Sequence, residues 1–102
     1  MSIKHNRRIM IIATMTFKLR ASWVHSLKEK RMIVNSLIAK LQNKFHASVA
    51  EIDEQDTHQI IVIGVASIVA HNAMADSLMD SISEFVEMNT EAEIIEEERE
   101  VI

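Results

Sequence analysis

The chain has 102 residues, of which 48% are hydrophobic and 25% are charged, and its formal net charge is −4. This length and composition predict one domain, residues 1–102, with a single core, and the lack of cysteine excludes disulfides and suits a reducing cytoplasm. No apolar run approaches the roughly 20 residues of a membrane span, and the mildly acidic balance argues against indiscriminate nucleic-acid binding. We therefore expect a cytoplasmic protein with no membrane partner.

The charges are distributed unevenly along the chain. Ten of the eleven Lys and Arg residues lie within residues 1–46, and fourteen of the fifteen Asp and Glu residues lie within residues 47–102. Such an asymmetry marks either an electrostatic binding surface or two halves that neutralise each other in one fold. Residues 1–8 form a basic N-terminal extension that we expect to be flexible.

The first half of the chain predicts a strand, a helix and a second strand. Apolar residues alternate over residues 9–20, as in a strand. Ser26, followed three residues later by Glu29, fits a capping box at the start of a helix that ends near Phe45. Helical spacing places one set of apolar residues on its core face: Leu27, Val34, Ile38, Leu41 and Phe45. Residues 47–53 predict the short second strand.

The second half predicts a strand, a helix and a strand. Residues 59–69 are apolar on both faces, as in a central strand. Asn72 is a suitable N-cap for a second helix that ends near Asn89, and residues 92–102 form a last strand with poor alternation. The order β-α-β-β-α-β predicts an α+β fold of the ferredoxin-like type. We expect a four-stranded antiparallel sheet, in the order 4-1-3-2, with both helices on one face.

Three segments resemble the YlxP-like proteins, a small bacterial domain family of unknown function. They are residues 25–31 (HSLKEKR), 48–56 (SVAEIDEQD) and 64–66 (GVA). The resemblance implies a ferredoxin-like fold and a gene setting near translation-initiation and ribosome-maturation factors, hence a connection with the ribosome or RNA. It supplies no catalytic residues. The chain departs from the family pattern in the basic residues 2–8 and in His58, which stands where the family has an aromatic residue.

The predicted topology brings the start of the first helix and the end of the second strand to one edge of the molecule. The candidate residues for binding an anion, RNA or a partner are Trp23, His25, Lys28, Lys30 and Arg31, and their candidate ion-pair partners are Glu51, Asp53 and Asp56. The free N–H groups at a helix start add affinity for anions. Arg31 lies near the core face of the helix, so we expect it to be partly buried beside a carboxylate.

Several interpretations of this cluster remain open. One is a structural set of ion pairs that orders the connection after the second strand. The others are a mixed-charge site for a phosphate or a protein, and a catalytic site. Trp23 is either a lid over the helix start or an exposed anchor for a base or a partner. No phosphate-binding loop, nucleophile motif or metal-ligand spacing is present in the sequence, so we expect no cofactor and no metal.

Three classes of function follow from these observations. The first is a binding module for ribosomal RNA or ribosomal subunits that contacts phosphates through the first turn of the first helix. The second is a protein-interaction module, a homodimer through the open sheet face without nucleic-acid contact, because an apolar face needs a cover. An enzyme is the third and has the least support.

The predicted fold also brings opposite charges together. Antiparallel pairing of the first and last strands predicts Arg7 and Arg8 near Glu98 and Glu100. By the same pairing, Lys18 and Arg20 approach Glu91 and Glu93, and the basic first helix lies beside the acidic second helix. We therefore expect much of the charge asymmetry to cancel locally.

Overall fold

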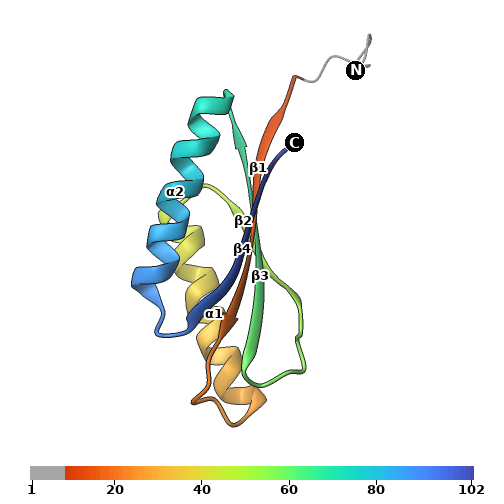
Figure 1. Ribbon diagram of the computed structural model, residues 1–102, viewed down its shortest axis with the longest axis vertical. Helices are drawn as coiled ribbons and strands as arrows, with labels where there is room; N and C mark the ends of the chain where they lie inside the picture. The colour runs from red at the N-terminus through yellow and green to blue at the C-terminus, as the bar shows by residue number, and fades with distance from the viewer. Residues whose placement is uncertain (1–8) are drawn as a thin grey trace.

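A computed structural model describes residues 9–102 and contains six elements in the order β-α-β-β-α-β (Figure 1). They are β1 (Ile11–Arg20), α1 (Leu27–Lys44), β2 (Ser48–Asp53), β3 (Ile60–Val69), α2 (Asn72–Asn89) and β4 (Glu93–Val101). Every element lies within two residues of the range that the sequence predicts. The extension of residues 1–8, and its expected flexibility, lie outside the described residues.

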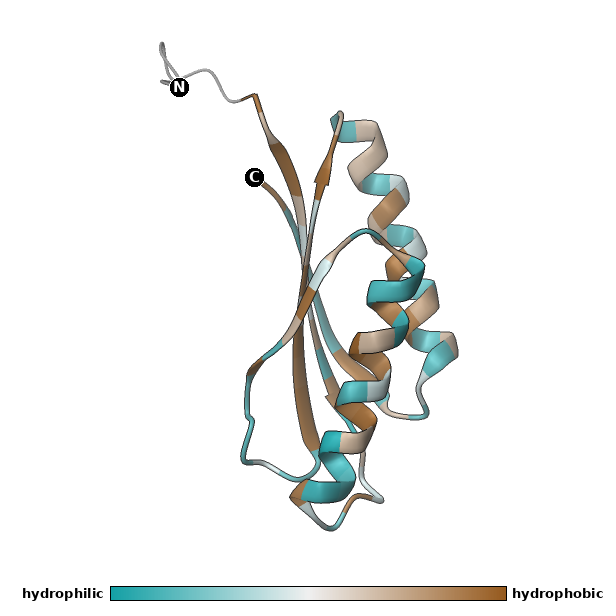
Figure 2. Cartoon of the chain, turned by 180° about the vertical axis from the view of Figure 1, so that it is seen from behind, coloured by the Kyte–Doolittle hydropathy of each residue, from teal (hydrophilic) through white to brown (hydrophobic). Residues whose placement is uncertain are grey.

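The four strands form one antiparallel sheet in the order β2-β3-β1-β4, which is the predicted order read from the other edge. Both helices cover one face of this sheet, and the other face is left open (Figures 1 and 2). The two central strands pair along their whole length, from Ile11 opposite Val69 to Arg20 opposite Ile60. The predicted α+β class and strand order are confirmed, and the two most apolar strands, β1 and β3, take the central positions.

The core lies between the sheet and the two helices. Its largest fully buried apolar side chains are Phe17, Leu19, Leu41, Ile61, Ile63 and Ile82. Phe45 at the end of α1 meets Phe85 of α2 edge to face, with ring centroids 5.5 Å apart. Along β1 the buried residues alternate with half-buried ones, so one side of the strand packs against the helices and the other lies on the open face.

Side chains cap both helices. The Ser26 hydroxyl accepts a hydrogen bond from the Glu29 N–H at 3.1 Å, which confirms the predicted capping box, while the Glu29 carboxylate accepts one from the His25 N–H at 2.9 Å. Helix α2 is capped by His71, whose Nδ1 accepts from the Met74 N–H at 3.3 Å. The prediction of Asn72 as this cap is wrong by one residue, because His71 has the extended backbone that an N-cap requires.

Replacement of Ser26 by alanine is expected to lower the free energy of unfolding by about 1 kcal/mol, because the Glu29 N–H loses its acceptor. Urea denaturation monitored by circular dichroism measures this loss. Ser36→Ala, at an exposed position inside the same helix, is the matched control and is expected to be neutral or slightly stabilising. Equal losses for both variants would contradict the capping role.

A β-bulge explains the poor alternation of the last strand. Glu96 lies opposite Lys18, but Ile94 lies opposite Leu19, so one extra residue of β4 is inserted between these pairs. A second irregularity in β2 lies between Glu51 and Asp53. Glu51 lies on the helix side by ordinary alternation from Val49, and Ile52, next to the irregularity, packs beside Gly64 on the open face.

Candidate functional site

Lys30 is buried inside the first turn of α1, with 1% of its surface exposed. Its Nζ lies 3.1 Å from Oε2 of Glu51 and also donates a hydrogen bond to the backbone oxygen of Glu54. Lys30 precedes Val34 by four residues, so the helical period places it in the buried stripe of α1. The start of α1 is therefore tied to β2 and to the connection that follows it.

The partners of Lys30 belong to an ordered turn. Glu51 Oε2 is buried and has no hydrogen bond, so the charge of Lys30 is what compensates its burial within the described part of the chain. Glu54 has φ 58°, in the left-handed region that side chains disfavour. Its carbonyl also accepts from the Thr57 N–H at 3.0 Å, and its N–H donates to Asp53 Oδ1 at 2.8 Å. This geometry fits the interpretation of Lys30 and Glu51 as a structural ion pair.

Arg31 is exposed, so the prediction that it is partly buried is wrong. The cation in the buried stripe is its neighbour Lys30, because the stripe runs through Val34 and Leu37 and Arg31 lies to one side of it. Among residues 9–102, no carboxylate lies within 4.0 Å of the Arg31 guanidinium. Arg31 is thus free to meet an external anion, whereas Lys30 is not.

The other candidate residues stay at the surface. Trp23, His25 and Lys28 are exposed around the start of α1, and Asp53 and Asp56 are exposed at the β2–β3 connection. Neither aspartate forms an ion pair within the described residues. The predicted cluster therefore separates into a buried pair, Lys30 with Glu51, and a set of solvated charges.

The expected cancellation of charge between the two halves is not seen as ion pairs among residues 9–102, apart from one. Residues 9–102 contain three ion pairs, and Lys30 is the one cation of the first half that takes part in them. Strand pairing places Arg20 opposite Glu93, as predicted, but Lys18 lies opposite Glu96 rather than near Glu91. The predicted partners Arg7 and Arg8 lie outside the described residues.

Among the acidic residues of α2, Asp80 pairs with β4. Arg99 of β4 lies 2.7 Å from Asp80 and 2.8 Å from Glu97, and Glu97 also accepts a hydrogen bond from Ser83. The hydrogen bond to Asp80, followed by that to Glu97, raises the pKa of Arg99. The register explains this arrangement, because Arg99 and Glu97 lie opposite Met15 and Phe17 on the helix-covered side of the sheet.

An uncompensated row of cations follows the outside of α1. We call it the basic ridge, and its residues are Lys28, Met32, Ser36, Lys40 and Lys44, all exposed. Residues four apart are neighbours on a helix surface and form a continuous row. In the part of the chain that the structure describes, no carboxylate lies within 4.0 Å of the amino groups of Lys28, Lys40 and Lys44. The ridge therefore presents three free positive charges.

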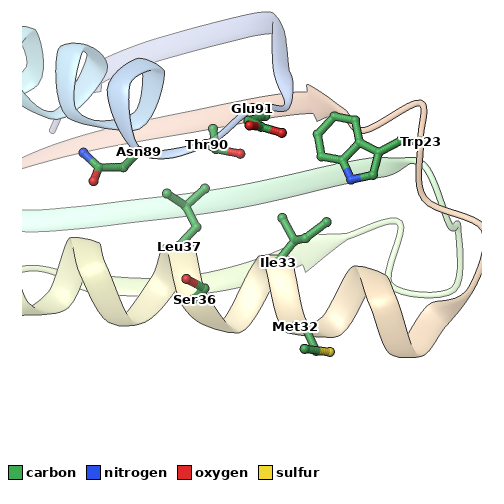
Figure 3. Close-up of a pocket in the computed structure, with 8 residues that line it drawn as sticks. All are labelled: Trp23, Met32, Ile33, Ser36, Leu37, Asn89, Thr90 and Glu91. Carbon is green, nitrogen blue, oxygen red and sulfur yellow. The ribbon is translucent and has the colours of Figure 1, made fainter.

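A groove of about 340 Å³ runs beside this ridge, and we call it the Trp23 groove (Figure 3). It is lined by Trp23, Met32, Ile33, Ser36, Leu37, Asn89, Thr90 and Glu91. Trp23 stands at one end, with α1 along one side and the α2–β4 connection along the other. The Trp23 side chain is 41% exposed, so its ring forms part of an open wall. Apolar walls with a few polar groups are typical of ligand-binding clefts.

Sequence reasoning found Trp23 and Lys28 but missed the rest of this surface. Asn89, Thr90 and Glu91 reach the groove only because α2 ends beside α1, which no local pattern reveals. Lys40 was visible as a polar position of the helix, and its spacing of twelve residues from Lys28 was the available signal.

Two further structural findings concern residues 9–102. No three or more His, Cys, Asp or Glu side chains are grouped so that they would hold a metal ion. Neither helix in this range combines the length and the apolar character that crossing a membrane requires.

The fold and its surfaces define a small α+β domain that offers a cationic, groove-bearing helix face. The chain belongs to the family described as "Protein of unknown function (DUF503)", whose family model matches residues 12–99. It is 32% identical over 68 residues to "Uncharacterized protein YlxP" of Bacillus subtilis (strain 168), across 67% of this chain and 74% of that protein. These findings confirm the predicted YlxP-like family, and neither description states an activity.

Proposed function

We propose that this protein is a ferredoxin-like domain that binds single-stranded RNA, such as an exposed segment of ribosomal RNA, along the basic ridge and in the Trp23 groove. One observation carries the proposal: the exposed Trp23 stands beside a row of i, i+4 residues that winds along α1, and the three lysines of this row have no carboxylate partner in the described part of the chain. Proteins that bind single strands combine the same two features, aromatic rings for the bases and cations for the backbone.

In this proposal the groove contacts the bases of the RNA and the ridge contacts its phosphates. Trp23 offers a ring on which a base stacks, and Ser36, Asn89 and Thr90 supply hydrogen-bonding groups for base edges. Lys28 and Lys40 lie one helical turn beyond either end of the groove-lining Met32 and Ser36. They are separated by about 18 Å along the helix axis, at 1.5 Å per residue, and by about 120° around it, so an RNA strand that contacts both lysines would cross α1 obliquely past the groove.

The residues predicted at the start of α1 fit this proposal in part. His25 and Arg31 are exposed beside Lys28, and Arg31 extends the cationic surface, whereas Lys30 is buried in its ion pair with Glu51. Because the chain as a whole is acidic, with a net charge of −4, an anion is favoured only where cations are concentrated. A localised cationic surface on an acidic protein favours a defined RNA site over general binding to polyanions.

Co-sedimentation with purified ribosomal subunits tests the function. Retention at low salt that falls steeply with rising salt is expected, with a slope of log K against log salt near −2 for three lysines on a single strand. Retention that does not depend on salt, or no retention on subunits and no binding to single-stranded RNA, would overturn the proposal.

Protein interaction through the open sheet face is the second candidate. Ile52 and Ile68 are exposed on this face, by 51% and 68%, and no other element of residues 9–102 covers it. The sequence predicts a second copy of the chain as the cover.

A further inference from the structure

The open face of the sheet carries a trough that runs along the strands. Three hollows of about 490, 290 and 280 Å³ adjoin one another there. Ser48 and Ala66 line both the 490 Å³ hollow and the 290 Å³ hollow. Thr16 lines both the 290 Å³ hollow and the 280 Å³ hollow. The trough extends from Ile12 to Lys18 along β1, which is about 20 Å at 3.3 Å per residue.

Small side chains form the floor of this trough. Thr14, Ala50, Gly64 and Ala66 lie at its centre. A Cβ atom placed on Gly64 would lie 3.1 Å from Ile52 Cγ2, so Ile52 packs directly beside the glycine and forms the wall on the β2 side. The result is a mostly apolar, open floor between Ile52 and β4.

The opposite wall is acidic. Glu98 and Glu100 of β4 lie opposite Thr16 and Thr14, so their side chains stand on the open face beside the trough. Both are exposed, and no cation lies within 4.0 Å of either carboxylate in the described part of the chain. Lys18 and Glu96 lie at the end of the trough. A ligand for this face therefore combines apolar side chains with positive charges along one flank.

The backbone of the ligand must satisfy its own hydrogen bonds. The N–H and C=O groups of β1 and β3 are already used within the sheet, so a segment that lies on the face receives no ladder bonds. A helix pairs its own backbone groups, whereas an extended segment leaves them unpaired. A trough of about 20 Å matches a helix of about 13 residues at 1.5 Å per residue.

Self-association is disfavoured by charge. The described cations of the open face are Lys18 and Arg20, and Arg20 lies opposite Glu93. Packing two such faces together would bury Glu98 and Glu100 of both copies without matching cations, which costs free energy. A second copy therefore fits this surface less well than a cationic partner.

We propose that the open sheet face binds a cationic amphipathic helix of about 13 residues from a partner protein. Its apolar side chains enter the trough beside Ile52, and its Lys or Arg flank lies along Glu98 and Glu100. The mode is that of a helix in an apolar groove, recognised by its anchors and by the charge of its flank. This site is on the opposite side of the sheet from the basic ridge, so the two proposals stand independently.

Fluorescence polarisation with a labelled 14-residue Leu/Lys peptide, leucines on one face and lysines on a flank, tests the proposal at 150 mM salt. The double variant Glu98→Lys/Glu100→Lys is expected to bind the peptide about tenfold more weakly than the wild type. The matched control Glu84→Lys/Glu87→Lys makes the same change in net charge on α2, and is expected to stay within about twofold.

Two further measurements complete the test. A peptide with glutamates in place of the lysines is expected to prefer the Glu98→Lys/Glu100→Lys variant, and Ala50→Gln, which fills the trough, is expected to weaken binding of the Leu/Lys peptide. Ala39→Gln on exposed α1 is the control for Ala50→Gln. Equal peptide affinity in both charge variants, no binding to the wild type, or a dimer in sedimentation that Ala50→Gln abolishes would each overturn the proposal.

Discussion

Replacement of Lys30 by methionine is expected to lower the free energy of unfolding by about 3 kcal/mol, the usual loss when one partner of a buried ion pair is removed. The carboxylate of Glu51 would remain in a buried position with no compensating charge, and the carbonyl of Glu54 would lose a donor. Methionine keeps the length of the side chain, so lost packing contributes little. Urea denaturation followed by circular dichroism measures the change.

Arg31→Met is the matched control for this variant. It removes one positive charge from the adjacent residue, but Arg31 is exposed and unpaired in the described part of the chain, so its loss is expected to stay below about 0.5 kcal/mol. The double variant Lys30→Met/Glu51→Met is expected to recover much of the stability, because neither charge is then buried alone. A larger effect at Arg31 than at Lys30 would contradict the assignment of the buried cation.

The double variant Lys28→Gln/Lys40→Gln is expected to bind a single-stranded RNA about tenfold more weakly at 50 mM salt. Its slope of log K against log salt is expected to become shallower by about 1.4, since each lost phosphate contact accounts for about 0.7. Both lysines are exposed on the helix surface, so the fold is expected to be unaffected. A titration of labelled oligoadenylate at several salt concentrations measures both quantities.

Lys18→Gln/Arg20→Gln is the control for this double variant. It lowers the net charge by the same amount, but Lys18 and Arg20 lie on the open face of the sheet, away from the basic ridge. Its affinity is expected to stay within about twofold of the wild type, with a small loss from the long-range field. Equal losses in both double variants would mean that net charge, rather than the ridge, governs binding.

The sequence predicted the fold well because its main signals are local. Alternation in β1, the capping box at Ser26 and the apolar run of β3 each depend on near neighbours, and together they determine the strand order. The register of the last strand was harder to predict, because a bulge beside Ile94 shifts its alternation by one residue. The cap of α2 was misplaced because His71 and Asn72 both carry suitable acceptors, and only the backbone conformation distinguishes them.

The candidate site was less predictable, because it depends on contacts between distant segments. Charge counting could not show that Lys30 is buried, although its spacing of four residues from Val34 pointed in that direction. Lys18 and Arg20 face glutamates of β4 but form no ion pairs among residues 9–102, because a strand register alone does not bring flexible side chains together. The cation that pairs with Asp80 of α2 and with Glu97 is instead Arg99 of β4.

The two proposed surfaces lie on opposite sides of the sheet. The basic ridge and the Trp23 groove belong to the helix layer, and the trough with its acidic wall belongs to the open face (Figures 1 and 2). A domain of this kind would hold an RNA segment on one side and a protein helix on the other. On these two proposals, the segregated charges of the sequence would serve two partners of opposite charge.

Because Trp23 is the single tryptophan of the chain, its fluorescence reports directly on the groove. The most direct test of RNA binding is a fluorescence titration with oligoadenylate at 50 mM salt, repeated at 500 mM. Stacking of a base on the indole predicts saturable quenching at low salt that is largely lost at high salt. Unchanged Trp23 fluorescence at an oligonucleotide concentration that saturates binding, or no binding at low salt, would contradict the account.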